Sequence, residues 1–200
     1  PDRPRVIFIS TPHNPTGTFT PRAGIARLPA ALPGQVRLVL DAAYAEYMDE
    51  GQDDGAMELA STKANVLVTR TFSKIHGLAA ERIGWGYAHA DIIGAMNRIR
   101  LPFNVTTAGQ EAAVAALASE DFVTKSREHN AKWRQWLSDE MGALGNHGLK
   151  IVPSHTNFLL LLFEGKVTAE QANSALMDKG YAVRWLPGQG LVNGLGITIG

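Results

Sequence analysis

Four short runs of apolar and β-branched residues set the main constraint on how this chain can fold. They cover residues 5–10, 36–40, 66–70 and 83–88. Runs of this length and composition are typical of buried β-strands. Between the first two runs, Thr20 can cap a helix and Pro21 can occupy its first position, with the helix continuing to about Ala31. This alternation of strands with loops and helices predicts an α/β architecture.

Polar residues follow each of the first three runs, at the point where the predicted strand ends. The first run leads into His13-Asn14-Pro15-Thr16-Gly17. The second ends in Asp41, with Tyr44 three residues later, and the third leads into Thr71-Phe72-Ser73-Lys74. In open α/β sheets the carboxyl ends of the strands form the edge at which ligands bind. The sequence therefore predicts a ligand site at this edge.

Lys74 is the residue of this group with the most distinctive chemistry. A lysine held after a strand, among small residues and hydroxyls, can form a Schiff base with an aldehyde cofactor. Thr71, Ser73 and Arg82 supply the hydroxyl donors and the fixed cationic fork that a phosphate group requires. The alternative for this stretch alone is a surface lysine in a loop. The stretches around Asn14 and Asp41 favour the chemical interpretation.

Composition narrows the classes of function. Lys and Arg number 19, as do Asp and Glu, so no charge excess points to nucleic acid or acidic lipid. The absence of cysteine excludes disulfides and thiolate metal sites and fits a reducing cytoplasm, and six scattered histidines suggest no metal centre. The first residues lack the pattern of a signal peptide, and the longest apolar run, 158–163, is too short to span a bilayer.

The second half of the chain carries a different pattern. Residues 50–64 are expected to form a loop with one helical turn, and residues 90–118 a helix interrupted at 101–104. A long amphipathic helix is predicted over 121–144, with Trp133 and Trp136 in the core. Strands over 150–152, 156–163, 181–185 and 196–199 and a helix over 168–179, closed by Gly180, complete the prediction. A domain boundary is expected near residues 118–121.

Taken in order, the three stretches resemble the fold-type I aminotransferases, which use pyridoxal 5'-phosphate (PLP). The stretch SKIHGLAAERIGW is most similar to the histidinol-phosphate aminotransferase branch of class II. The resemblance implies that residues 1–118 form the C-terminal part of the large PLP-binding domain and that 119–200 form an incomplete small C-terminal domain. Family members are considerably longer, so the chain is expected to be part of a longer polypeptide.

The resemblance also implies a role for each polar residue. Lys74 matches the lysine that binds the cofactor and shuttles the α-proton, and Asp41 matches the carboxylate beside the ring nitrogen. Tyr44 and Asn14 match the two groups that bind the phenolic oxygen of the ring. The phosphate grip corresponds to Thr71, Ser73 and Arg82. Taken singly, Asp41 could be a helix cap, Tyr44 a core residue and Asn14-Pro15 a turn.

On the substrate side the sequence departs from the family. Gly196 stands where the family places the arginine that clamps the substrate carboxylate, which puts bidentate recognition in doubt. Arg184 matches a family position that meets the distal or phosphate end of substrates. Asn157 and Asn104 fall where family residues line the site or support the hinge between domains.

The resemblance therefore implies amino-group transfer between an L-amino compound, for example histidinol phosphate, and a 2-oxo acid such as 2-oxoglutarate. It further implies a cytoplasmic homodimer in full-length form, with small-molecule substrates and no nucleic acid or membrane partner. The alternatives are an aromatic aminotransferase, a threonine-phosphate decarboxylase, or a non-catalytic sensor module with the same fold. A truncated chain could also be inactive by itself.

Overall fold

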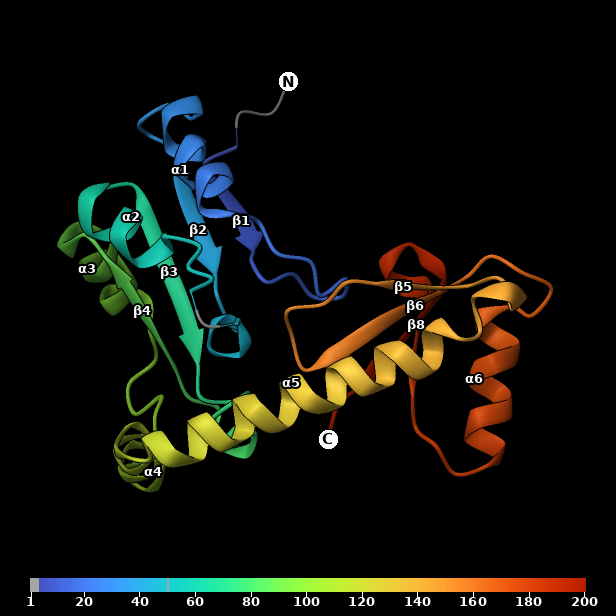
Figure 1. Ribbon diagram of the computed structural model, residues 1–200. Coiled ribbons are helices and arrows are strands. Elements are labelled where there is room, and N and C mark those ends of the chain that lie inside the picture. The colour runs from blue at the N-terminus through green and yellow to red at the C-terminus, as the bar shows by residue number, and fades with distance from the viewer. Residues whose placement is uncertain (1–3, 50) are drawn as a thin grey trace. The chain divides into compact units, whose positions relative to one another are not determined.

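The computed structural model describes residues 4–49 and 51–200 (Figure 1). The chain divides into two compact units. The first comprises Thr20–Ser126 with the segment ending at Pro12, and the second comprises His13–Phe19 and Arg127–Gly200. The helix α5 (Glu120–Gly142) therefore begins in the first unit and ends in the second. The domain division predicted from the sequence, 1–118 and 119–200, stays a prediction.

The first unit is built on a four-stranded sheet in the order β1-β2-β3-β4. Its strands are β1 (Val6–Ser10), β2 (Arg37–Asp41), β3 (Val66–Thr71) and β4 (Gly84–Ala88). The first three are parallel, and β4 runs antiparallel to β3. Ser10 pairs with Asp41, and Asp41 pairs with Thr69, so β1 and β2 end level with one another and β3 continues two residues further. The predicted strands and the α/β class are confirmed.

Apolar side chains on one face of this sheet form the core of the first unit. Leu38, Leu40, Val66 and Val68 are completely buried there. The helix α2 (Ala56–Thr62) packs on β3 and β4, and α1 (Arg22–Ala31) lies against α2 (Figure 1). Two further helices, α3 (Ala90–Ile99) and α4 (Thr107–Ala118), follow β4. They are separated where the sequence predicted an interruption.

Two local predictions for the first unit were wrong. Pro21, and not Thr20, occupies the N-cap of α1, and no side chain caps that helix. Residues 56–62 form a helix rather than a loop with one turn. The backbone N–H of Ala56 donates to Oδ1 of Asp54 at 2.9 Å, and Gly55 has a left-handed φ of 70° at the N-cap. These features start α2 within a stretch whose acidic and small residues resemble a loop.

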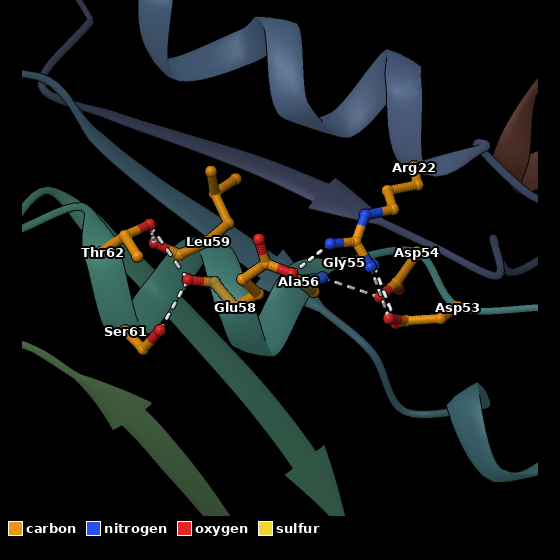
Figure 2. Close-up of polar contacts among 9 residues, drawn as sticks. All are labelled: Arg22, Asp53, Asp54, Gly55, Ala56, Glu58, Leu59, Ser61 and Thr62. Atoms are coloured by element: carbon orange, nitrogen blue, oxygen red, sulfur yellow. Dashed lines mark hydrogen bonds and ion pairs between the residues drawn. The ribbon is translucent and has the colours of Figure 1, made fainter.

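Arg22 links α1 to the start of α2 (Figure 2). Its Nη1 donates to Oδ2 of Asp53 at 3.0 Å, and its Nη2 donates to Oε2 of Glu58. All three side chains are more than half exposed. Water therefore screens these ion pairs, and each stabilises the fold by about 1 kcal/mol or less.

The second unit contains an antiparallel sheet in the order β5-β6-β8-β7. Its strands are β5 (Leu149–Val152), β6 (Phe158–Phe163), β7 (Arg184–Leu186) and β8 (Leu191–Thr198). The helix α6 (Ala169–Asp178) starts with a capping box between Thr168 and Gln171. Residues from α5 and α6 pack on a buried cluster of sheet and C-terminal residues: Leu159, Leu161, Leu195 and Ile199.

The prediction that Trp133 and Trp136 lie in the core was wrong. Trp133 is 38% exposed and Trp136 is 51% exposed, and the two rings meet edge to face with centroids 5.5 Å apart. Leu137 and Met141, one turn apart on α5, pack against the core instead. Adjacent residues on a helix point about 100° apart, and here Leu137, not Trp136, is directed at the core. No helix in the described part of the chain combines the length and apolar character needed to cross a bilayer.

Candidate active site

Asp41 lies at the carboxyl end of β2, between the ends of β1 and β3. The backbone N–H of Thr11 donates to the carbonyl of Asp41 at 3.0 Å, and that of Ala42 donates to the carbonyl of Thr69 at 3.0 Å. These bonds hold the end of the strand on both sides. The carboxylate is exposed, and its Oδ1 accepts a bond of 3.2 Å from the Ala43 N–H. An anionic group is therefore held at the ligand-binding edge of a parallel sheet.

Tyr44 is the N-cap of a short 3₁₀ helix, η1 (Ala45–Tyr47). Tyr44 is 4% exposed and Tyr47 is 8% exposed. Burial, with smaller contributions from the neighbouring Tyr44 and Glu46, raises the pKa of Tyr47 to about 12. The two tyrosine side chains of this turn are therefore buried, although Asp41 at the end of β2 is exposed.

Lys74 lies in a turn that begins where β3 ends. The N–H of Gly77, with a φ of 72°, donates to the carbonyl of Lys74 at 2.9 Å. Phe72 and Ile75, on either side of Ser73 and Lys74, are 5% and 2% exposed. Because these two apolar side chains are anchored in the interior, the polar side chains between them are held in place.

The structure brings Lys74 and Tyr44 together. The Lys74 Nζ lies 5.1 Å from the centroid of the Tyr44 ring, within the range of a cation–π contact. These residues come from segments that follow two neighbouring parallel strands, β2 and β3. Their contact unites two of the three stretches that the sequence singled out.

Arg82, Ser73 and Thr71 form a second polar group after β3. Arg82 has a left-handed φ of 55°, and its Nη1 donates to Ser73 Oγ at 3.1 Å and to the Ala79 carbonyl at 2.8 Å. Both bonds use Nη1, so among the described residues Nε and Nη2 make no such bond. Thr71 Oγ1 accepts from the Ser73 N–H at 3.0 Å and donates to the Ile83 carbonyl at 3.4 Å. Thr71 thus orders the turn, while Ser73 and Arg82 keep donors for an anion.

Asn14 belongs to the second unit, in the loop His13–Phe19. The N–H of His13 donates to the Thr18 carbonyl and the N–H of Gly17 donates to the His13 carbonyl, both at 2.7 Å. The N–H of His155 donates to the Gly17 carbonyl at 2.8 Å, which ties the loop to the segment before β6. Placement of Asn14 beside the lysine stays a prediction.

The two substrate candidates also lie in the second unit. Arg184 is exposed at the start of β7. Asn157 precedes β6, and its carbonyl accepts a bond of 2.8 Å from the Ile199 N–H. Asn104 lies in the first unit, exposed, with its Oδ1 3.5 Å from Arg100 Nη1. A role for any of them in binding substrate stays a prediction.

The sequence did not predict an ion pair between the segments that carry Tyr44 and Lys74. Arg70 Nη1 donates to Glu46 Oε1 at 2.9 Å, and their side chains are only 19% and 17% exposed. Arg70 lies in the predicted strand 66–70 and Glu46 lies two residues after Tyr44, but neither was singled out as a site residue. A charged residue within a predicted buried strand was the one available signal, because such a charge needs a partner.

Among the described residues, no group of three or more His, Asp or Glu side chains is arranged to hold a metal ion. The arrangement instead combines an amine beside an aromatic ring, a carboxylate at a strand end, and a guanidinium with a neighbouring hydroxyl. Such a set can bind a ligand that carries both an aldehyde, covalently through the amine, and an anionic group, electrostatically through the guanidinium.

Comparisons with known proteins agree with this description. Residues 1–191 match the family model described as aminotransferase class I and II. The chain is 63% identical to the histidinol-phosphate aminotransferase of Sphingopyxis alaskensis over 199 residues, and 60% identical to that of Zymomonas mobilis over 198. These matches cover 100% and 99% of this chain but 54% of each relative. The chain thus spans about half the length of the curated relatives it matches.

Among solved structures, the chain is similar to the histidinol-phosphate aminotransferase of Sinorhizobium meliloti in complex with pyridoxal-5'-phosphate. The TM-score is 0.85, the identity is 31%, and the match covers 98% of this chain and 52% of that one. The likeness therefore extends through both compact units.

Proposed function

Because the chain belongs to the class I and II aminotransferase family, we propose that the protein containing it is a PLP-dependent aminotransferase. It transfers an amino group between an L-amino compound and a 2-oxo acid. The observation that carries the proposal is the contact between the Lys74 Nζ and the Tyr44 ring, 5.1 Å away, at the ends of neighbouring strands. The high identity to relatives named histidinol-phosphate aminotransferase supports this reaction over the decarboxylase and sensor alternatives.

The residues of the first unit fit PLP. A carboxylate ends β2, a phenol follows it and an amine follows β3, which suits a cationic pyridine ring that bears an aldehyde. The Nε and Nη2 groups of Arg82 and the hydroxyl of Ser73 suit a phosphate, because Ser73 Oγ already accepts from Arg82 and can donate its own proton. The first unit therefore offers a group for each of the aldehyde, ring and phosphate parts of the cofactor.

PLP, when bound, supplies an electron sink for the carbon that bears the amino group. Lys74 Nζ would hold the cofactor and, after the substrate amine replaces it, would move the α-proton. The Asp41 carboxylate would keep a proton on the ring nitrogen, because a nearby negative charge favours the protonated form. Tyr44 and Asn14 would bind the phenolic oxygen. Ser73 and Arg82 would hold the phosphate, with Thr71 ordering the turn that carries Ser73.

The names of the relatives indicate the substrate. We propose histidinol phosphate as the amino compound, with a 2-oxo acid such as 2-oxoglutarate as its counterpart, and Arg184 and Asn157 as residues that contact substrate. The full-length protein is proposed to be a cytoplasmic homodimer, with small molecules as its substrates and neither nucleic acid nor membrane as a partner.

The experiment that tests the proposal traps the cofactor on its lysine. The protein expressed from its complete gene is incubated with PLP, reduced with borohydride, and digested for peptide mass mapping. The pyridoxyl group should be found on Lys74. Lys74→Ala should abolish this label, whereas Lys63→Ala and Lys150→Ala, which remove exposed lysines, should leave it in place.

A label on Lys63 or Lys150 in place of Lys74 would contradict the assignment. Labelling of Lys74 without amino transfer from histidinol phosphate to 2-oxoglutarate would support the cofactor site and exclude the proposed substrates.

A further inference from the structure

The Glu46–Arg70 ion pair connects the two segments that carry Tyr44 and Lys74. Glu46 lies in η1, two residues after Tyr44, and Arg70 lies in β3, four residues before Lys74. The bond from Arg70 Nη1 to Glu46 Oε1 measures 2.9 Å. The backbone bond from the Ala42 N–H to the Thr69 carbonyl, at 3.0 Å, joins the same segments where they leave the sheet. The ion pair therefore links these two segments a second time, after the last hydrogen bond between β2 and β3.

Arg70 is itself fixed by contacts on other elements. It pairs in register with Trp85 of β4, and its Cζ lies 6.0 Å from the centroid of the Trp85 ring. Its charge also acts on the buried carboxyl of Asp54, whose pKa it lowers in opposition to the larger raising effect of burial. A side chain with partners on β4 and near the start of α2 cannot easily follow Glu46 if that residue shifts. The position of Arg70 therefore fixes the position of the Glu46 carboxylate.

A contribution to the stability of the fold does not by itself explain why an ion pair occupies this position. Both side chains are more than four-fifths buried, and removing two charges from water cancels most of what their attraction contributes. Apolar residues of similar volume would stabilise such a position as well or better. What an ion pair adds is direction, because the planar guanidinium fixes the position of the carboxylate oxygen it binds.

We propose that Glu46 and Arg70 are positioning residues that hold Tyr44 against Lys74, and so prepare the lysine for its cofactor. This inference rests on the function proposed above. Neither residue is placed in contact with cofactor or substrate; both act through η1 and β3. Their loss should slow the attachment of PLP to Lys74 even where the fold is intact.

The test measures attachment to Lys74 in the absence of substrate, using the protein expressed from its complete gene. PLP is added to the cofactor-free protein, the absorbance change is followed with time, and borohydride mapping confirms the site. Glu46→Gln and Arg70→Lys should each slow attachment by about 10-fold, since a displacement of about 1 Å in a reacting group can cost about 100-fold. The pH at which the absorbance of the bound cofactor changes should shift in both variants.

The double variant Glu46→Leu with Arg70→Met separates positioning from stability. It removes both charges of the pair together, so neither partner is left buried alone, and its melting temperature should stay near that of the parent protein. Attachment of PLP to Lys74 should nevertheless be about 10-fold slower than in the parent protein, because the hydrogen bond that positions η1 is lost. Arg22→Gln, which breaks an exposed pair elsewhere in the same unit, serves as the matched control and should attach PLP at the parental rate.

Parental attachment in the double variant, or a rate that follows melting temperature across all variants, would overturn the inference. Failure of the double variant to fold would overturn it as well, since the pair would then be required for folding itself. Absence of any label on Lys74 in the parent protein would instead reject the proposed function, so the two failures can be told apart.

Discussion

Gly196 lies directly opposite Arg184 in the antiparallel pair of β7 and β8. A Cβ atom added to Gly196 would lie 3.6 Å from the Arg184 carbonyl oxygen and 3.8 Å from the Arg184 Cβ, which are ordinary van der Waals distances. The backbone therefore has room for a side chain at the position where the family resemblance expects an arginine. Arg184 is the nearest cation on the facing strand.

Replacing Gly196 with Arg should tighten the binding of carboxylate substrates to the full-length protein. A charge-assisted pair with the carboxylate is worth about 1.5–3 kcal/mol, whereas two like charges facing each other across the strands cost up to about 1 kcal/mol. Substrate dissociation constants for parent and variant measure the difference. Gly188→Arg, at an open position in the same unit, is the control for added charge. Unchanged affinity in Gly196→Arg would mean that another residue already binds the carboxylate.

Asp41 should contribute through its charge rather than through its hydrogen bond to Ala43. Asp41→Asn keeps an oxygen that can accept from the Ala43 N–H, while Asp41→Ala removes both charge and acceptor. Both variants should raise the barrier to turnover by roughly 3–4 kcal/mol, the cost of removing one strong electrostatic contact. Cofactor affinity should change much less.

Steady-state turnover and PLP titration test this expectation, with Asp91→Asn as the control because Asp91 is a highly exposed carboxylate at the start of α3. Near-normal turnover of Asp41→Asn would show that the residue only orders the turn after β2.

Asp54 should make the fold less stable as the pH rises. It is 2% exposed, and burial raises its pKa, so the folded protein retains the proton at pH values where the unfolded chain has released it. The unfolded state then binds fewer protons, and the free energy of unfolding falls with pH until the folded carboxyl has also ionised. Asp54→Asn keeps the acceptor for the Ala56 N–H (Figure 2) and should flatten this dependence.

Denaturant unfolding of the parent and of Asp54→Asn across the acidic range, from the ordinary carboxyl pKa upward, measures the slope. Asp91→Asn, which removes an exposed carboxylate at the start of α3 and not a neighbour of Asp54, should retain the parental slope. Identical slopes for the parent and Asp54→Asn would show that Asp54 ionises freely.

Tyr47 should ionise only at strongly alkaline pH. Burial raises its pKa from 10.0 to about 12, so the folded state holds the phenolic proton across this interval while the unfolded state loses it. Stability contributed by the protonated phenol is present below pH 10.0 and is lost as the pH rises towards 12. Tyr47→Phe should remove this loss.

Phenolate absorbance provides the measurement. The parent should show a tyrosine that titrates near pH 12, and Tyr47→Phe should lack it. Tyr181→Phe, which removes a tyrosine that is 63% exposed, should leave that step unchanged. Persistence of the step in Tyr47→Phe would assign it to another residue.

Much of the fold followed from local pattern. The runs at 36–40 and 66–70 predicted buried strands, and Leu38, Leu40, Val66 and Val68 are indeed fully buried in two neighbouring strands. A run of β-branched and apolar residues between turn signals has few ways to satisfy both its backbone and its side chains, so the inference is reliable. The family was also visible in the sequence, because its motifs consist of short contiguous stretches.

Tertiary structure decided the contacts that join those stretches. The contact of Lys74 with Tyr44, and the pairing of Glu46 with Arg70, link residues that lie 24 or more positions apart. Trp136 and Leu137 show the same dependence, since both fit an amphipathic helix and packing alone brought Leu137 to the sheet. Backbone preference acts between near neighbours and can be seen in the sequence. Which side chains share a face, a charge or a buried position depends on how the assembled elements pack.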